Sequence, residues 1–406
     1  MIAAAQVTSK HLTSKDLIMA AIKKTLSRRQ FLTLTTAAVA ASPFLNMGNY
    51  QVFAASEMTY SDRAITLVND SLVMDMLSIL DMTRLFAADG NGTDPLKFSR
   101  DEILAVKQSG INIFHPAIGL GGPGVQLDAM NFMAGYNGLV NEHPDLLMRI
   151  DSVEDIDALQ SNGKIGIILG LQNSDHFATV EDVKRYYFAG QRISQLTYNS
   201  QNRIASGSTD RADGGISDYG ESIVKAMNEV GMAVDVSHCG DQTTLDAFSL
   251  STKPVLITHS NCRALVPEHP RCKTDEAILA MAAAGSVMGI TAVRNFVTAE
   301  EPTTINSYID HIDHVVELAG IDHVGIGTDA DLYGYDALPP EIYAALKSGY
   351  KSSYGFRDKI DIEGLDHPKK MYDLTEALVQ RGYSDDNIKA ILGGNFKRVL
   401  GDIWVS

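Results

Sequence analysis

The sequence has 406 residues, of which 45% are hydrophobic and 21% are charged. This composition excludes a disordered chain, a collagen-like chain and a coiled coil, and it supplies enough apolar residues for a large core. Asp and Glu total 50 against 34 Lys and Arg, so the formal net charge is −16. A net charge of this sign repels nucleic acid and anionic lipid, and we therefore expect no nucleic-acid partner.

The first 54 residues have the pattern of an export signal. Arg28 and Arg29 precede an apolar run from Leu32 to Leu45, and a small-residue cleavage pattern ends at Ala54. The pattern resembles a twin-arginine signal, and the apolar run is too short to form a stable membrane span. We therefore expect residues 1–54 to be removed and residues 55–406 to form a single periplasmic or secreted domain.

Further along the chain, short apolar runs alternate with longer amphipathic segments, as in βα units around a parallel sheet. Helix-start signals such as Ser152 and Thr179 lie between the runs. This alternation predicts a (β/α)8 TIM-type barrel, with a doubly wound open sheet as the alternative. The expected strands are Leu72–Met76, Ile111–Ile118, Leu146–Ile150, Ile165–Leu171, Ile193–Tyr198, Ala233–Val236, Val255–Thr258, Val287–Val293 and Val324–Gly327.

Two segments after the last expected strand depart from the alternation. Residues Leu332 to Pro368 are rich in Tyr, Gly and Lys, and we expect them to form an excursion near the barrel mouth. Residues Ser384 to Leu400 have the apolar spacing of a closing C-terminal helix.

Three polar clusters stand where apolar runs end. They contain His238, His259 and Asp329. A barrel presents its functional side chains at the carboxyl ends of its strands, so these three are expected to converge. Neutral imidazoles and a carboxylate from neighbouring strands suit a divalent metal such as zinc.

The blocks around these residues resemble peptidase family M19, the membrane dipeptidases of the amidohydrolase superfamily. The matching blocks are LTYN, GGISDYGESIVKAMNEVGMAVDVSH, PVLITHSNCRAL, HPRCKTDE and HVGIGTDAD, in this order. The resemblance implies a (β/α)8 metal-dependent hydrolase that acts on dipeptides through a binuclear zinc centre, commonly as a homodimer. It implies that His238 and His259 hold one zinc and that Asp329 handles the proton of the attacking water. It further implies that Arg271 binds the free carboxylate of the substrate.

Several positions depart from the family pattern. The first strand of the family carries a His and an Asp that bind the second zinc, and here these positions are Leu77 and Ile79. The bridging glutamate of the family corresponds to Gln172, a neutral amide that is a poor bridge between two cations. The family's substrate-polarising histidine corresponds to Tyr198, which can still donate one hydrogen bond. The sequence therefore predicts at most one metal ion per chain.

Three hypotheses follow from this altered site. In the first, a dipeptidase uses one divalent metal on His238 and His259, with Tyr198 and Asn199 contacting the substrate. In the second, a metal-free enzyme tailors a peptide-like secreted metabolite by acid–base chemistry. In the third, the protein is a non-catalytic periplasmic binder of a small carboxylate ligand. The candidates for a further metal ligand in the first hypothesis are Asp329, Gln172, Asp175, His176 and Cys239.

Overall fold

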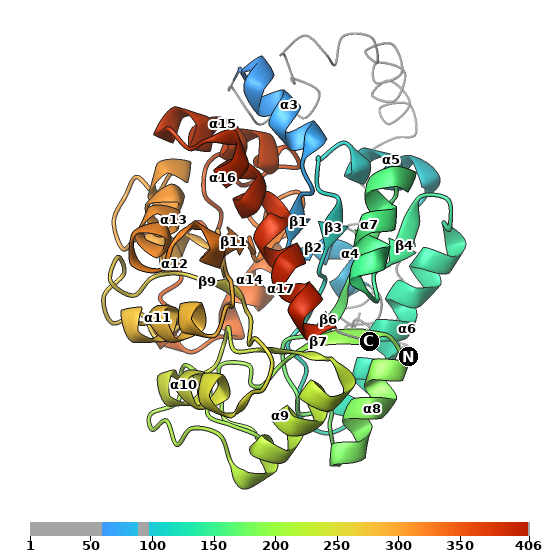
Figure 1. Ribbon diagram of the computed structural model, residues 1–406, viewed down its shortest axis with the longest axis vertical. Helices are drawn as coiled ribbons and strands as arrows, with labels where there is room; N and C mark the ends of the chain where they lie inside the picture. Colours follow the sequence, from blue (N-terminus) through green and yellow to red (C-terminus); the bar gives the residue numbers. More distant parts are fainter. Residues whose placement is uncertain (1–58, 88–96, 405–406) are drawn as a thin grey trace, which may run out of the picture. The chain divides into compact units, whose positions relative to one another are not determined.

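The computed structural model describes residues 59–87 and 97–404. Its short parallel strands alternate with helices along the chain, as the sequence predicts (Figure 1). The strands are β1 Met74–Asp75, β2 Ser78–Ile79, β3 Ile113–Phe114, β4 Leu147–Arg149, β5 Ile165–Ile167, β6 Leu169–Leu171, β7 Gln191–Gln195, β8 Ala233–Asp235, β9 Ile257–Ser260, β10 Met288–Ile290, β11 Val324–Ile326 and β12 Ala330–Asp331.

The helices between and after the strands are mostly two to five turns long. The helical segments are α3 Asp62–Asp70, α4 Met82–Ala87, α5 Arg100–Lys107, α6 Val125–Glu142, α7 Val153–Asn162, α8 Val180–Phe188, α9 Asp218–Val230, α10 Asp241–Leu250, α11 Asp275–Ala283, α12 Arg294–Val297, α13 Ile305–Ala319, η2 Ile321–His323, α14 Pro340–Ser348, η3 Ser352–Tyr354, α15 Lys370–Arg381, α16 Asp385–Lys389, η4 Ala390–Gly394 and α17 Asn395–Ile403.

Local sequence accounts for several helix starts. Ser152 and Thr179 each form a capping box with the Asp three residues later, which satisfies amide groups at the starts of α7 and α8. The α10 helix instead begins after Gly240, which has no side chain to cap it.

The strands close into the predicted barrel. Parallel pairing runs from β1 to β3, from β3 to β5 and, through β6, on to β7 and β8. A bridge between Asp235 and Leu256 continues the ring to β9, which pairs with β10, and β10 pairs with β11. The ring closes where the Met76 amide donates to the Ile326 carbonyl and where β12 pairs with β2.

The expected strand Leu146–Ile150 forms β4 but takes no separate place in the ring. It pairs with β5, the first half of the third barrel strand, while β7 pairs with the second half, β6. The barrel therefore uses eight of the nine expected strands, because periodicity identifies a strand but not its partner.

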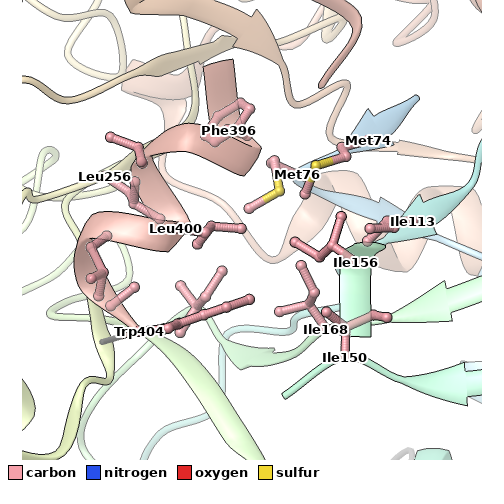
Figure 2. Packing of buried hydrophobic residues seen from close by; sticks show 14 of the residues in the cluster. Met74, Met76, Ile113, Ile150, Ile156, Ile168, Leu256, Phe396, Leu400 and Trp404 are labelled. Atoms are coloured by element: carbon pink, nitrogen blue, oxygen red, sulfur yellow. The ribbon is translucent and has the colours of Figure 1, made fainter. Parts of the chain in front are cut away.

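The amino-terminal end of the barrel is filled by apolar side chains. Helix α17 lies across this end. Phe396 and Leu400 on the helix and Trp404 directly after it pack against residues in or next to the strands around the ring (Figure 2). With this end packed, the carboxyl ends of the strands remain for a site. The cluster residues that lie in a strand or directly next to one include Met76, Ile113, Ile168, Ile193, Ala233, Leu256 and Val287.

The excursion expected between Leu332 and Pro368 contains α14 and η3. Its aromatic residues Tyr335, Tyr350 and Tyr354 line a cavity together with Tyr198 and Asp329, which confirms its predicted place near the barrel mouth. Within the described residues no helix is long and apolar enough to cross a membrane.

Candidate active site at the carboxyl ends of the strands

The barrel brings His238 and His259 together, as the sequence predicts. His238 lies three residues after β8 ends, and His259 lies within β9. Both side chains are buried, and their Nε2 atoms are 2.9 Å apart. Two imidazoles whose Nε2 atoms lie this close form a pair of potential metal ligands.

The outer ring nitrogen of each histidine is held by a separate group. His238 Nδ1 lies 2.7 Å from the amide oxygen Oδ1 of Asn199, which only accepts, so His238 carries its hydrogen on Nδ1. The Thr258 hydroxyl donates to Asp235 at 2.7 Å, so it is available to accept from Nδ1 of His259 at 2.8 Å. Each Nε2 therefore directs its lone pair toward the other ring, and two lone pairs this close are stabilised by a proton or a cation that both nitrogens bind.

Burial, aided by nearby positive charges, keeps both rings neutral. Burial lowers the pKa of His238 and of His259 well below the usual range, and the nearby Arg271 and Lys273 lower both further. A neutral imidazole is the form that binds a metal. The pair thus has the protonation state as well as the geometry of a ligand pair.

Arg271 lies directly behind this pair. Its side chain is 1% exposed, and its two terminal nitrogens donate to the backbone carbonyls of Ser237 and His259. Its Nε has no hydrogen-bond partner among the described residues. The guanidinium therefore holds the backbone at Ser237, next to His238, and at His259, and leaves Nε as a buried donor for a further group.

Asp329 stands at the end of β11 in a left-handed backbone conformation, with φ of 52°. Its amide donates to the Leu77 carbonyl, which fixes the turn. Burial raises the pKa of its carboxyl to about 7; Arg271 opposes the shift and Asp75 adds to it. A carboxyl with this pKa exchanges a proton readily near neutral pH, as a general acid–base group must.

Tyr198 connects the histidine pair to the excursion. Its ring stacks on His238, with 4.2 Å between centroids, and its hydroxyl lies 2.6 Å from that of Tyr350. Burial raises the pKa of Tyr198 well above its usual value, so the phenol keeps its proton. Tyr198 and Asp329 line the same cavity.

The positions that depart from the family pattern do not form a second ligand set. Leu77 and Ile79 are buried apolar side chains. Gln172 donates from its amide nitrogen to the Ala117 carbonyl at 2.7 Å, while its Oε1 lacks a partner among the described residues. One unpaired amide oxygen supplies no charge, so these residues do not fit a second metal ion.

His176 does not join the site. Its Nδ1 lies 3.0 Å from the Asn173 carbonyl and its Nε2 lies 3.0 Å from Gln191, so both ring nitrogens are engaged. Burial lowers its pKa to about 4, so the packed imidazole is neutral near pH 7. This environment argues against His176 as a metal ligand. The neighbouring Asp175 is half-buried and lies in the same loop, near Gly121.

Cys239 is likewise a packed residue. Its sulfur accepts from the Thr197 hydroxyl at 3.3 Å, and burial raises the pKa of the thiol. The described residues contain no group of three or more His, Cys, Asp or Glu side chains placed to hold a metal. Any metal bound here therefore relies on the two histidines for its protein ligands.

The predicted site residues do not include two further residues, Tyr350 and His115. Tyr350 contacts Tyr198 from the excursion, and only the density of tyrosines in that segment hinted at it. His115, on the strand beside β1, is 2% exposed and bonds Met76 through Nδ1 at 2.7 Å; its Nε2 lacks a partner within the described chain. The position of His115 directly after an apolar run was the available signal.

Comparison with known proteins places these features in a family. The family model described as membrane dipeptidase (peptidase family M19) matches residues 119–343. Dipeptidase verJ of Clonostachys rogersoniana is 32% identical over 268 residues, which cover 65% of this chain and 62% of verJ. Dipeptidase aclJ of Aspergillus oryzae is 30% identical over 292 residues, covering 69% of this chain and 63% of aclJ. The match thus spans less than two thirds of either relative.

A solved structure supports the fold independently. An amidohydrolase from Pseudomonas aeruginosa superposes with a TM-score of 0.72 at 29% identity, covering 84% of this chain and 99% of that one. The superposition covers nearly all of that chain, in keeping with the barrel traced above.

Proposed function

Because the chain belongs to the membrane dipeptidase family, peptidase family M19, a family of metallopeptidases, we propose that it hydrolyses the amide bond of a dipeptide or a related small peptide. One observation carries the proposal: the Nε2 atoms of His238 and His259 face each other at 2.9 Å, and Asp329, whose carboxyl pKa burial raises to about 7, follows β11 at the same end of the barrel.

The residues fit one divalent metal ion, zinc being the first candidate. His238 and His259 would hold it, because each ring is oriented through Nδ1 and directs an Nε2 lone pair to the same point. Such an ion, when bound, supplies Lewis acidity toward the substrate carbonyl and lowers the pKa of water. The remaining coordination positions would be open to water and substrate.

The chain's own residues supply the proton transfers. Asp329 in its ionised form accepts a proton from the attacking water and, once protonated, returns it to the departing amine. Its pKa near 7 suits both steps, because neither proton transfer is then strongly uphill. The neutral phenol of Tyr198 is a hydrogen-bond donor for the developing oxyanion, a role open to it when Tyr350 is the donor in the contact between the two hydroxyls.

Arg271 is proposed to bind the free carboxylate of the substrate. Its Nε is a buried donor without a partner in the described chain, and a carboxylate is the group a guanidinium binds best. The test compares a dipeptide with its C-terminal amide. We expect the amide to raise KM in the native protein and to have little effect in Arg271→Lys; equal KM values for acid and amide in the native protein would refute the proposal.

The experiment that tests the function measures metal per chain and dipeptide hydrolysis on the same preparation. About one metal per chain, activity lost with a chelator and activity restored by zinc would support the single-metal hydrolase. Turnover that resists the chelator but needs Asp329 would favour the metal-free tailoring enzyme. Ligand-induced stabilisation without any product would favour the binding protein.

We also propose export and self-association. The paired arginines Arg28 and Arg29 support twin-arginine export, and these residues lie outside the described ones. Replacing both by Lys should leave the protein in the cytoplasm, and unchanged fractionation would refute export. The family resemblance favours a homodimer, which light scattering on the purified protein would test.

A further inference from the structure

The mouth of the site is covered by an aromatic group that the proposed reaction does not use. Tyr350, Tyr354 and Phe356, here called the aromatic cover, all come from the excursion after α14. The rings of Tyr350 and Tyr354 stack at 4.5 Å, and Phe356 lies 5.2 Å from both. These are the distances of packed aromatic contacts.

The aromatic cover is joined to the barrel on both sides. Tyr354 packs edge-to-face on Phe296 at 5.1 Å, and its carbonyl accepts from the Asn295 amide. Tyr350 reaches the catalytic end through Tyr198, which stacks on His238. The aromatic cover therefore forms one wall of the active site.

A small cavity lies between this cover and the catalytic groups. Its volume is about 30 Å³, roughly the space of one water molecule. Asp329 and the phenols of Tyr198, Tyr335, Tyr350 and Tyr354 supply its polar atoms. The remaining lining is apolar: Val293, Phe296, Leu346, Phe356 and Ile360.

A substrate side chain can enter only if the cover moves outward. All nine residues of α14 remain at least partly exposed, so this helix is held by little buried area. On its carboxyl side, Lys351 bonds the Thr209 carbonyl at 3.0 Å from an exposed position. The α14 helix and the adjoining Tyr350 therefore separate from the barrel at lower cost than a buried helix, as active-site lids do, while Tyr354 stays packed on Phe296.

We propose that the aromatic cover, together with Phe296, forms the substrate side-chain pocket and selects small peptides that carry an aromatic or large aliphatic residue. This inference rests on the proposed hydrolase function and names its substrate class. Apolar walls gain from burying such a side chain, and aromatic rings add edge-to-face contacts. A charged side chain would lose its hydration there without finding a partner of opposite charge on the cover.

The test uses the full chain loaded with zinc and two dipeptide series, Xaa-Gly and Gly-Xaa, with Xaa as Ala, Leu, Phe, Asp or Lys. We expect kcat/KM for Phe to exceed that for Ala by at least about tenfold in one series, since hydrophobic pockets discriminate to this degree. Phe356→Ala should reduce this ratio severalfold. Tyr350→Phe, which keeps the ring and removes the hydroxyl contact, should retain it. A matched control is Phe188→Ala, which truncates a ring that is 73% exposed.

A native Phe-to-Ala ratio near one, or a ratio that Phe356→Ala leaves unchanged, would overturn the pocket while leaving the hydrolase in place. If no dipeptide is hydrolysed, the hydrolase proposal fails, and the pocket is then tested by binding alone. Thermal stabilisation of Asp329→Asn by Phe-Gly and Gly-Phe is compared with that by Ala-Gly and Gly-Ala. Stronger stabilisation by a Phe dipeptide supports the pocket, and equal or absent stabilisation overturns it.

Discussion

Asn199 Oδ1 accepts a hydrogen bond from His238 Nδ1 at 2.7 Å, and this contact fixes which ring nitrogen faces His259. Asn199 itself has a left-handed backbone, with φ of 60°, and its short side chain reaches Nδ1 of the imidazole. Asn tolerates this conformation better than most residues. The sequence predicted Asn199 as a substrate contact, whereas the contact the structure shows is with a candidate metal ligand.

Removing the hydrogen bond between Asn199 and His238 should weaken metal binding. Asn199→Gly keeps the left-handed backbone and deletes the acceptor, and we expect the metal dissociation constant to rise by about 10- to 100-fold, the usual effect of losing an outer-shell partner. Asn199→Asp keeps an acceptor at the same place and should bind at least as tightly as the native protein. Competition with a chromophoric chelator measures both. Equal affinities for the Gly and Asp variants would show that His238 is oriented by something else.

The effect of substitution on metal binding should differ sharply between the two site histidines and His176, a buried histidine outside the site. His238→Ala and His259→Ala are each expected to abolish metal binding, because one remaining imidazole makes a poor site. His176→Ala should lower the melting temperature, since it leaves the Gln191 and Asn173 partners unpaired, yet keep the metal content. Elemental analysis and calorimetry on the three variants decide this. Metal lost from the His176 variant at temperatures where it remains folded would place that residue in the site after all.

The sequence was sufficient for most of the barrel because each strand is a short apolar run that ends at a polar residue. It was not sufficient for the C-terminal segment, expected as one helix from Ser384 to Leu400. The structure interrupts that helix with η4, where a Cβ on Gly393 would lie 2.4 Å from the Leu72 carbonyl. Only the folded chain reveals such a close approach, since Leu72 is distant in sequence.

In the site, too, the sequence predicted some residues but not the environment of others. His238, His259 and Asp329 were predictable because strand ends meet at one edge of the barrel. The environment of His176 was not, because closeness to Gln172 in sequence does not say which way a side chain points. The contact between Tyr198 and Tyr350 joins residues 152 positions apart, and no periodicity reports on that separation.

Asp329 should control both activity and the pH dependence of stability. Asp329→Asn suits the same left-handed backbone and should lower kcat by about 100-fold or more, as expected for a lost acid–base group. In native protein kcat/KM should rise with pH as Asp329 ionises, because the base must be ionised; a bound cation favours the ionised form and lowers the midpoint below the metal-free value of about 7. Asp329→Asn should lose this rise, and a variant that keeps both the rate and the rise would exclude the proposed role.

The stability effect has a definite sign in metal-free protein. The folded pKa of about 7 exceeds the ordinary value of 3.8, so the folded state binds more protons between these limits. Stability therefore falls as pH rises through this window. The buried Asp331 shifts in the same direction, so the comparison is between native protein and Asp329→Asn, which both retain it. The Asn variant should lose less stability between about pH 4 and pH 8, measured by denaturant midpoints; a parallel decline would contradict the shift.

The packing of α17 against the strand starts should stabilise the barrel without touching its chemistry. Phe396 is fully buried in the cluster with Met74, Met76 and Leu256, whereas Phe188 is 73% exposed. Phe396→Ala should lower the free energy of unfolding by about 3–5 kcal/mol through lost burial and a residual cavity. The same truncation at Phe188 should change it by less than about 0.5 kcal/mol. The midpoints of urea unfolding curves, compared between variants whose curves have equal slopes, measure both changes in the free energy of unfolding. Because Phe396 packs at the amino-terminal end of the barrel and the histidine pair lies at the carboxyl end, the folded Phe396→Ala protein should keep its native metal affinity.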